Sequence, residues 1–162
     1  MAQKTEATKP LLVIKIRGTV RAQRETRETL NLLRLDHTNH AILIDSRPAY
    51  KGMLQRVNSY VTYGEPSKEL VTTMISKRGR IAGNKKITEE YLQHSGFKTV
   101  EDLAEAIVTL KTEYKNLPEI EPRFKLHPPS KGFKGNTKKG FKAGGEAGYR
   151  GEAINDLVKR MV

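Results

Sequence analysis

The sequence LLVIKIR at residues 11–17 is the stretch that decides the fold. Its alternation places apolar side chains on one face of an expected strand: Leu12, Ile14 and Ile16. Lys15 and Arg17 then lie on the other face. The pattern predicts a strand that packs on one side and meets a charged partner on the other.

The sequence on the C-terminal side extends this strand into a β-α-β-α-β unit over residues 10–65. A helix is predicted over residues 22–33 from one apolar stripe: Ala22, Thr26, Leu30 and Leu33. HAILID at 40–45 predicts a second strand, Pro48 lies near the start of a second helix, and YVTYGE at 60–65 predicts a third strand. We expect an α+β, two-layer sandwich of ferredoxin-like appearance, with both helices on one face of the sheet and the opposite face free for a partner.

Residues 66–117 have helical spacing and predict a three-helix insert. Helix starts are expected at Ser67, Thr88 and Thr99, the last with an acidic residue at the capping-box position. A helix-turn-helix DNA-binding regulator is therefore an alternative for this region. A recognition helix should be basic, however, and the two later helices carry the acidic residues Glu89, Glu90, Glu101, Asp102 and Glu105.

The composition changes again at residues 118–151, which predict an extended RNA-binding segment. Residues 122–151 hold 7 glycines, 8 basic residues and one acid, with aromatic residues at intervals. Lysines neutralise phosphates and aromatic rings stack on unpaired bases, so we expect this segment to thread along RNA and to order on assembly. A flexible, solvated linker is the alternative. Residues 152–162 predict a C-terminal helix, and residues 1–9 a flexible N-terminus.

The net charge of +12 is unevenly distributed along the chain. It is +5 over residues 1–65, zero over 66–121 and +7 over 122–162. Such an excess repels itself unless a polyanion neutralises it, which favours nucleic acid as the partner. The sequence contains no cysteine and no long apolar run, so we expect a reducing, cytoplasmic setting and no association with a membrane.

The sequence gives little indication of a catalytic or metal site. A phosphate-binding loop beginning at Gly79 fails twice, because Asn84 stands where glycine is required and Lys86 where serine or threonine is required. Asp36, His37 and His40 lie close together at a turn without a fourth ligand nearby. We expect no catalytic residue, no metal, no cofactor and no small-molecule substrate, with an enzyme built on the sandwich as the remaining rival.

The candidate RNA-binding residues form four groups. The first strand and first helix supply Lys15, Arg17, Arg21, Arg24, Arg27 and Arg34. The second helix and its start supply Arg47, Lys51 and Arg56. The basic loop of the insert supplies Lys77, Arg78, Arg80, Lys85 and Lys86. The C-terminal segment supplies Arg123, Lys125, Lys131, Phe133, Lys134, Lys138, Lys139, Phe141, Lys142, Tyr149 and Arg150. Arginine suits phosphate oxygens, but Glu25 and Glu28 interleave in the first group, so a salt-bridged, solvated face is the alternative there.

Several motifs resemble a known family over nearly the whole chain. The core motifs are Thr29-Leu-x-x-Leu-x-Leu35, Ala41 to Ile44, Gly52-Met-Leu-x-x-Val57 and Val61-Thr-Tyr-Gly-Glu65. The later motifs are Ile81 with Gly83-Asn-Lys-Lys-Ile87, Leu126-His-Pro-Pro-Ser-Lys-Gly-Phe-Lys-Gly135 and Gly145-Glu-Ala-Gly-Tyr-Arg-Gly-Glu152. The core motifs resemble large-subunit ribosomal protein L-thirty, and the later motifs resemble its longer archaeal form, whose eukaryotic counterpart is L-seven.

This resemblance carries further expectations that periodicity alone does not give. It implies a three-stranded antiparallel sheet, whereas helical crossovers would by default suggest parallel strands. It also implies a structural role in the large ribosomal subunit without catalytic activity. The implied partners are large-subunit ribosomal RNA, five-S RNA as an additional contact, and neighbouring ribosomal proteins.

Overall fold

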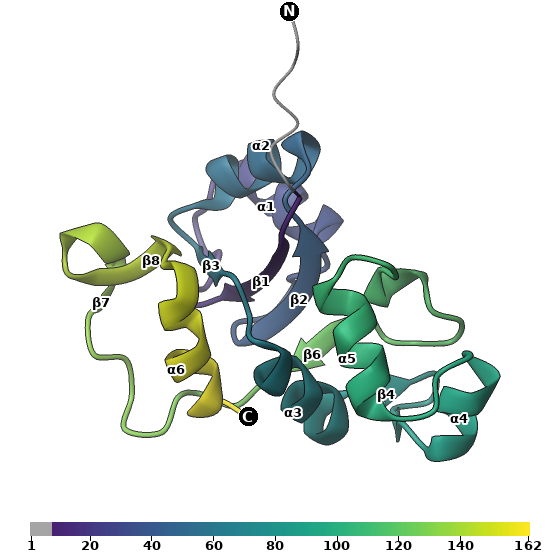
Figure 1. The fold of residues 1–162 in the computed structure, drawn as a ribbon. Helices are drawn as coiled ribbons and strands as arrows, with labels where there is room; N and C mark the ends of the chain where they lie inside the picture. The colour runs from purple at the N-terminus through teal and green to yellow at the C-terminus, as the bar shows by residue number, and fades with distance from the viewer. Residues whose placement is uncertain (1–7) are drawn as a thin grey trace, which may run out of the picture.

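The computed structural model describes residues 8–162 (Figure 1). Of the expected flexible N-terminus, residues 1–7 lie outside the described residues. Lys9 is held by two hydrogen bonds to Ser46. Its backbone N–H donates to the Ser46 hydroxyl at 2.8 Å, and its carbonyl accepts from the Ser46 N–H at 2.9 Å.

The first five elements follow the predicted β-α-β-α-β order. They are β1 (Pro10–Lys15), α1 (Arg24–Leu32), β2 (His40–Asp45), α2 (Pro48–Val57) and β3 (Val61–Gly64). Strand β1 is central and pairs antiparallel with β2 on one side and with β3 on the other. Its residue Leu12 lies opposite Leu43 of β2 and Gly64 of β3. The mixed α+β class is confirmed.

The prediction of three strands was wrong, because the sheet has six in the order β6-β2-β1-β3-β8-β7. The additional strands are β6 (Arg123–Lys125), β7 (Asn136–Gly140) and β8 (Gly145–Tyr149). Strand β6 is antiparallel to β2, whereas β8 is parallel to both β3 and β7. All three come from the segment expected to be extended, and their sequences are poor in the β-branched and aromatic residues that normally mark strands.

Glycine explains how so polar a segment can join the sheet. A Cβ at Gly145 would lie 2.0 Å from the carbonyl oxygen of Lys139, so any other residue there would block the approach of β8 to β7. Likewise, a Cβ at Gly64 would lie 2.0 Å from the carbonyl oxygen of Gly151. These glycines bring the backbone close to the protein's own backbone.

The expectation that one sheet face is free was also wrong, because helices cover both faces (Figure 1). One buried cluster joins α1 and α2 to Leu11 and Val13 of β1. The other joins Leu12 and Ile14 to α3 (Lys68–Arg78), α5 (Val100–Val108) and α6 (Ile154–Lys159). The reason lies in the LLVI run itself, which is apolar on both faces, as in strands covered on both sides.

The insert contains helices at the three predicted starts. Ser67, Thr88 and Thr99 cap α3, α4 (Glu89–His94) and α5, each accepting a hydrogen bond from a backbone N–H of the first turn. Between α3 and α4, a small hairpin of β4 (Arg80–Ile81) and β5 (Lys85–Lys86) occupies the basic loop. Residues 8–162 also contain three short 3-10 helices: η1 (Tyr114–Asn116), η2 (Phe141–Ala143) and η3 (Gly151–Ala153).

Candidate nucleic-acid interface

The arginines around α1 form an exposed stripe, here called the arginine surface: Arg17, Arg21, Arg24, Arg27 and Arg34. The helix buries Thr26, Thr29 and Leu30 against the sheet, which turns the arginines outward. Arg24 pairs with Glu28 at 2.6 Å, but both side chains are largely exposed, at 86% and 56%. The alternative of a salt-bridged face thus applies to this one pair. Within residues 8–162, no ion pair joins Arg21, Arg27 or Arg34 to a carboxylate.

Two residues that flank α1 have an unusual backbone conformation. Arg21 and Arg34, which flank the helix, have φ angles of 62° and 58°, a region that residues other than glycine rarely adopt. Arg17 is half-buried, and its guanidinium lies 5.2 Å from the centre of the Tyr60 ring. The arginine surface therefore extends over both ends of one helix, with the Arg17 side chain held against Tyr60.

Lys15 does not belong to this surface, which corrects the sequence prediction. Its side chain is 2% exposed, and its ammonium group donates a 2.7 Å hydrogen bond to the backbone carbonyl of Asp36. Burial lowers the pKa of Lys15, while the charge of Asp36 acts in the opposite direction. Helices cover the face that Lys15 was expected to present, so its side chain is not exposed at the surface.

Arg150 is also buried, and it anchors β8 to the sheet. It pairs with Glu146 at 2.5 Å, with side chains only 4% and 6% exposed. It also donates to the Thr62 hydroxyl at 2.7 Å and to the Glu146 carbonyl at 2.7 Å. The second carboxylate oxygen of Glu146 accepts from the N–H of Gly135 at 2.8 Å, so the group ties β3, β8 and the approach to β7 together. We name this set of contacts the Arg150 network.

The exposed lysines of the C-terminal segment gather on the β7–β8 projection, here called the lysine finger (residues 134–145). They are Lys134, Lys138, Lys139 and Lys142. In Figure 1 the finger extends from the edge of the sheet, on the side opposite β4. Phe141, the first residue of η2, is 37% exposed, and its ring centre lies 4.9 Å from the Arg150 guanidinium. The finger thus presents four cations and one ring.

Other predicted residues of this segment are less available. Phe133 is half-buried and packs against the hydrophobic core. Arg123 pairs with Asp36 and Glu121, both at 2.8 Å, and Lys125 lies 3.6 Å from the same Glu121. Lys131 is exposed. The hydrogen bond from Arg123 to Glu121 raises the pKa of Arg123, as expected for a guanidinium already matched by a carboxylate.

The basic loop of the insert forms a third group at the β4–β5 hairpin. Lys77, Lys85 and Lys86 are exposed there. Arg80 is half-buried and donates to the carbonyls of Lys77 and Gly79. Arg78 is half-buried as well and donates to the carbonyl of Val162 at 3.1 Å. The lysines are the accessible part of this group.

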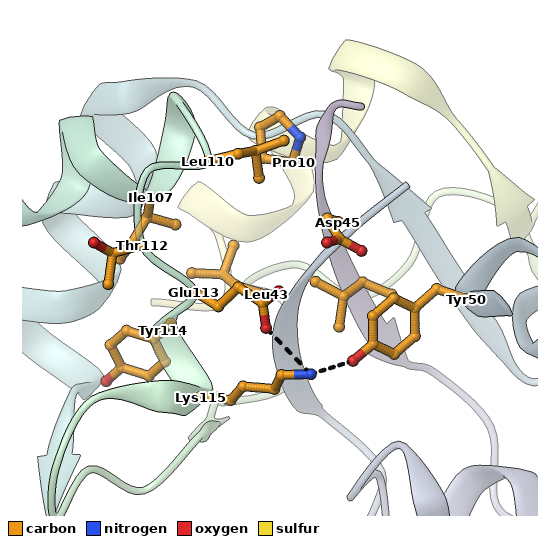
Figure 2. A pocket seen from close by; sticks show the side chains of 11 residues that line it. Pro10, Leu43, Asp45, Tyr50, Ile107, Leu110, Thr112, Glu113, Tyr114 and Lys115 are labelled. Atoms are coloured by element: carbon orange, nitrogen blue, oxygen red, sulfur yellow. Dashed lines mark hydrogen bonds and ion pairs between the residues drawn. The ribbon is translucent and has the colours of Figure 1, made fainter. Parts of the chain in front are cut away.

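On α2, Lys51 and Arg56 are exposed, whereas Arg47 connects the helix to the insert. Arg47 forms ion pairs with Asp45 and Glu113. Figure 2 shows the adjoining pocket, in which Lys115 reaches the Tyr50 hydroxyl at 2.5 Å and the Glu113 carboxylate at 3.2 Å. The pocket has a volume of only about 20 Å³, room for about one water, so it is a packing junction rather than a ligand site.

A larger groove was not anticipated from the sequence. It has a volume of about 610 Å³ and lies where β1, α2, β3 and β8 meet. Its lining residues are Lys9, Leu11, Ser46, Lys51, Leu54, Gln55, Tyr63, Glu65 and Tyr149. The VTYGE motif contributes two of them, Tyr63 and Glu65, although its sequence predicts only a strand and the family resemblance. We call this hollow the tyrosine groove.

Comparison with known proteins identifies the family. The family model for ribosomal protein L30p/L7e matches residues 11–61, from β1 to the start of β3. A large ribosomal subunit protein uL30 from Thermofilum pendens is 47% identical over 152 residues, which cover 93% of this chain and 97% of the relative. The chain belongs to the L30p/L7e family.

Two further L30p/L7e relatives support the same conclusion. The uL30 proteins of Archaeoglobus fulgidus and Methanobrevibacter smithii are 44% and 41% identical, over 92% and 93% of this chain and 97% and 99% of their own lengths. The resemblance to the archaeal form is therefore confirmed. Because L30p/L7e proteins are ribosomal structural proteins, the expectation of a non-enzymatic role is confirmed, and these relatives give the helix-turn-helix alternative no support.

The L30p/L7e family model ends at residue 61, so the lysine finger lies outside the part of the chain that it matches. Within residues 8–162, no group of three or more histidine, aspartate or glutamate side chains is placed to hold a metal ion. Within the same range, no helix has the length and apolar character required to cross a membrane.

Proposed function

We propose that this chain is a structural constituent of the large ribosomal subunit that binds large-subunit ribosomal RNA through two exposed basic surfaces. These are the arginine surface around α1 and the lysine finger. The observation that carries the proposal is the exposure of their cations, most of which have no carboxylate partner among the described residues. A phosphate backbone would supply the missing counter-charge.

The distribution of ion pairs supports this choice of surfaces. Arg47, Lys68 and Lys115 are already paired with carboxylates, and they lie on the insert or where it meets the core. Arg123 on β6 is likewise paired, with Asp36 and Glu121. Cations neutralised internally release few counterions on binding RNA, whereas the unpaired ones can each contact a phosphate. The finger and the arginine surface are therefore better candidates than the insert.

Two finer contacts belong to the same proposal. Contact with five-S RNA rests on the family resemblance, and it can be tested by retention of labelled five-S RNA on the immobilised protein. Contact with neighbouring ribosomal proteins is supported by the exposed acidic residues at the starts of α4 and α5: Glu89, Glu90, Glu101 and Asp102. An acidic surface of this kind fits a basic protein neighbour better than it fits RNA.

The experiment that tests the subunit assignment is gradient sedimentation of a cell extract, with detection of this chain. It should migrate with the large subunit and remain there at moderate salt. A chain found only at the top of the gradient, separate from both subunits, would contradict the proposal.

RNA binding is tested by the salt dependence of affinity for isolated large-subunit RNA. Replacing Arg21, Arg27 and Arg34 together with alanine should reduce the steepness of the log-log salt plot by about 2 to 3, at roughly 0.7–0.9 per phosphate contact. The control variant removes three exposed lysines outside the proposed surfaces: Lys98, Lys111 and Lys159. Equal slopes for the two variants would remove the arginine surface from the proposed interface.

A further inference from the structure

We propose that the side chain of Val20 packs on the face of one unpaired base of the bound RNA. This inference rests on the proposed function and names a specific contact within the arginine surface. Val20 lies in the loop between β1 and α1, in a four-residue turn at residues 19–22 that is here called the Val20 turn. Its side chain is 89% exposed, so the fold itself gives it almost no packing partner.

The Val20 turn holds this side chain in a fixed position. The backbone N–H of Ala22 donates to the carbonyl of Thr19 at 3.0 Å, which closes the turn around its two central residues. Both ends of the loop are anchored: Ala22 is buried, and the N–H of Ile16 donates to the carbonyl of Tyr60 at 3.0 Å. A single exposed valine is common on protein surfaces. A valine that the backbone fixes toward solvent, however, loses little conformational freedom on meeting a partner, which favours a role in binding.

The residue that follows Val20 in the turn has a strained backbone. Arg21 has a φ of 62°, and a positive φ at the third position of a turn normally selects glycine or asparagine. Glycine would relieve this strain, but it would also remove the guanidinium next to Val20. The strained arginine therefore indicates that the turn places a cation beside an apolar side chain for a purpose other than stability.

The charge around the Val20 turn favours RNA over a protein partner. Residues 17–24 (RGTVRAQR) hold three arginines and no acid. Among the described residues, neither Arg17 nor Arg21 has a carboxylate partner. Stacking of the Arg17 guanidinium on the Tyr60 ring leaves the edge of the guanidinium able to donate to phosphate oxygens. A basic protein neighbour would be repelled here, whereas RNA phosphates would be attracted next to Val20.

The form of the RNA follows from what an apolar side chain can bury itself against. The major groove of an RNA helix is too narrow to admit side chains, and its minor groove displays hydroxyl groups and base edges. Paired RNA therefore offers a valine little apolar surface. The face of a base that is not stacked on a neighbour is flat and apolar, and covering it removes apolar area of both groups from water. The phosphates that flank such a base are suited to the neighbouring arginines.

The first test locates the contact. Full-length protein with an aliphatic diazirine side chain at position 20 is bound to isolated large-subunit RNA and irradiated. We expect a crosslink at a single site, read as a stop in reverse transcription. Base-specific chemical modification should show that this nucleotide is unpaired in the free RNA and protected in the complex. A crosslink within a paired stem, or no crosslink to RNA, would overturn the inference. So would a crosslink to protein in assembled large subunits, since a protein neighbour would then occupy this position.

The second test separates apolar contact from charge through the salt dependence of affinity for the same RNA. Val20→Ser should weaken binding about tenfold at every salt concentration and leave the log-log slope unchanged, because a valine releases no counterion. Arg21→Gly keeps the turn and should reduce the slope by about 0.7–0.9. The control is Leu32→Ser, which removes an apolar side chain that is 75% exposed at the other end of α1 and should change neither quantity. Urea midpoints of the two serine variants should equal that of the intact protein, because both side chains are exposed.

Equal losses of affinity for Val20→Ser and Leu32→Ser would overturn the inference. A lower slope for Val20→Ser would do the same, because Val20 would then act only by positioning the arginines. The proposed function can stand without this contact. Intact protein that binds large-subunit RNA with a steep salt slope, but gives no RNA crosslink from position 20, would remove the Val20 contact alone. Intact protein without salt-dependent affinity would remove both.

Discussion

Arg150→Met tests whether the C-terminal segment is held in the sheet by the Arg150 network. The substitution leaves the Glu146 carboxylate, 6% exposed, without its cation, which lies 2.5 Å away in the intact protein. Removing one partner of a buried ion pair costs about 3–5 kcal/mol, because the remaining charge stays desolvated. The comparison is Arg24→Ala. Arg24 and Glu28 have the same sequence spacing but are 86% and 56% exposed, so its loss should cost only about 0.5 kcal/mol.

Urea unfolding monitored by circular dichroism measures both variants. With a slope of about 2 kcal/mol per molar urea for a protein of this size, Arg150→Met should lower the midpoint by roughly 1.5–2.5 M and Arg24→Ala by about 0.3 M or less. Replacing Glu146 with leucine in the Arg150→Met background should recover much of the loss, since no buried charge then remains unpaired. Equal midpoints for the two single variants would refute the reasoning. If Arg150→Met does not fold, Arg150→Lys should show an intermediate loss with a folded baseline.

Three further predictions concern single buried groups. Tyr114→Phe should raise the free energy of unfolding by about 1 kcal/mol in urea titrations, because the buried hydroxyl has no hydrogen-bond partner within residues 8–162, while its ring stacks on Phe124 at 4.8 Å. A loss of stability would contradict this. Burial, and then the charge of Arg123, lower the pKa of His40 from its ordinary 6.5. As the pH falls, the unfolded state therefore binds the proton before the folded state does, and the free energy of unfolding should decrease below about pH 6.5. A His40→Gln variant with the same pH dependence would exclude His40 as its source. Gly145→Ala should lower the free energy of unfolding by about 2 kcal/mol or more, because the added Cβ would lie 2.0 Å from the Lys139 carbonyl oxygen. It should also increase backbone hydrogen exchange in the lysine finger. Unchanged exchange would show that β7 and β8 need no glycine there.

The elements of residues 10–65 could be predicted because their signals are local. The stripe of α1 is buried as expected, at Ala22, Thr26, Leu30 and Leu33. Pro48 begins α2, and the caps of the insert helices are the residues that their chemistry selects. The direction of the strands could not be predicted in this way, because hydrophobic periodicity does not encode it. The antiparallel pairing was predicted from the family resemblance alone.

The sequence did contain a pattern that predicts burial of the second sheet face. Leu11 and Val13 are as apolar as Leu12 and Ile14, so the run from 11 to 14 already indicated burial on both faces. The two basic residues that follow suggested a charged partner instead. Lys15 shows that a lysine in a strand can turn inward when a backbone carbonyl accepts a hydrogen bond from its ammonium group. The residue that supplies this carbonyl, Asp36, is distant in the sequence. The burial of Arg150 could not be predicted for the same reason, because no local sequence pattern indicates its hydrogen bond to Thr62.

The C-terminal segment lacks the apolar residues for a core of its own, yet strands β6 and β8 pair with a sheet that the first half of the chain has built. Pairing with the sheet therefore compensates the entropy cost of ordering this segment before RNA binds, at least at the root of the finger. This gives a last prediction for Arg150→Met. Releasing β8 should weaken binding to large-subunit RNA, since re-ordering even two or three residues costs about 3 kcal/mol, on the order of a hundredfold in affinity. The salt slope should be unchanged, because the same lysines still meet phosphates in the final complex. Filter binding over a range of salt separates the two effects, and a slope that falls together with the affinity would mean that the finger no longer reaches the RNA at all.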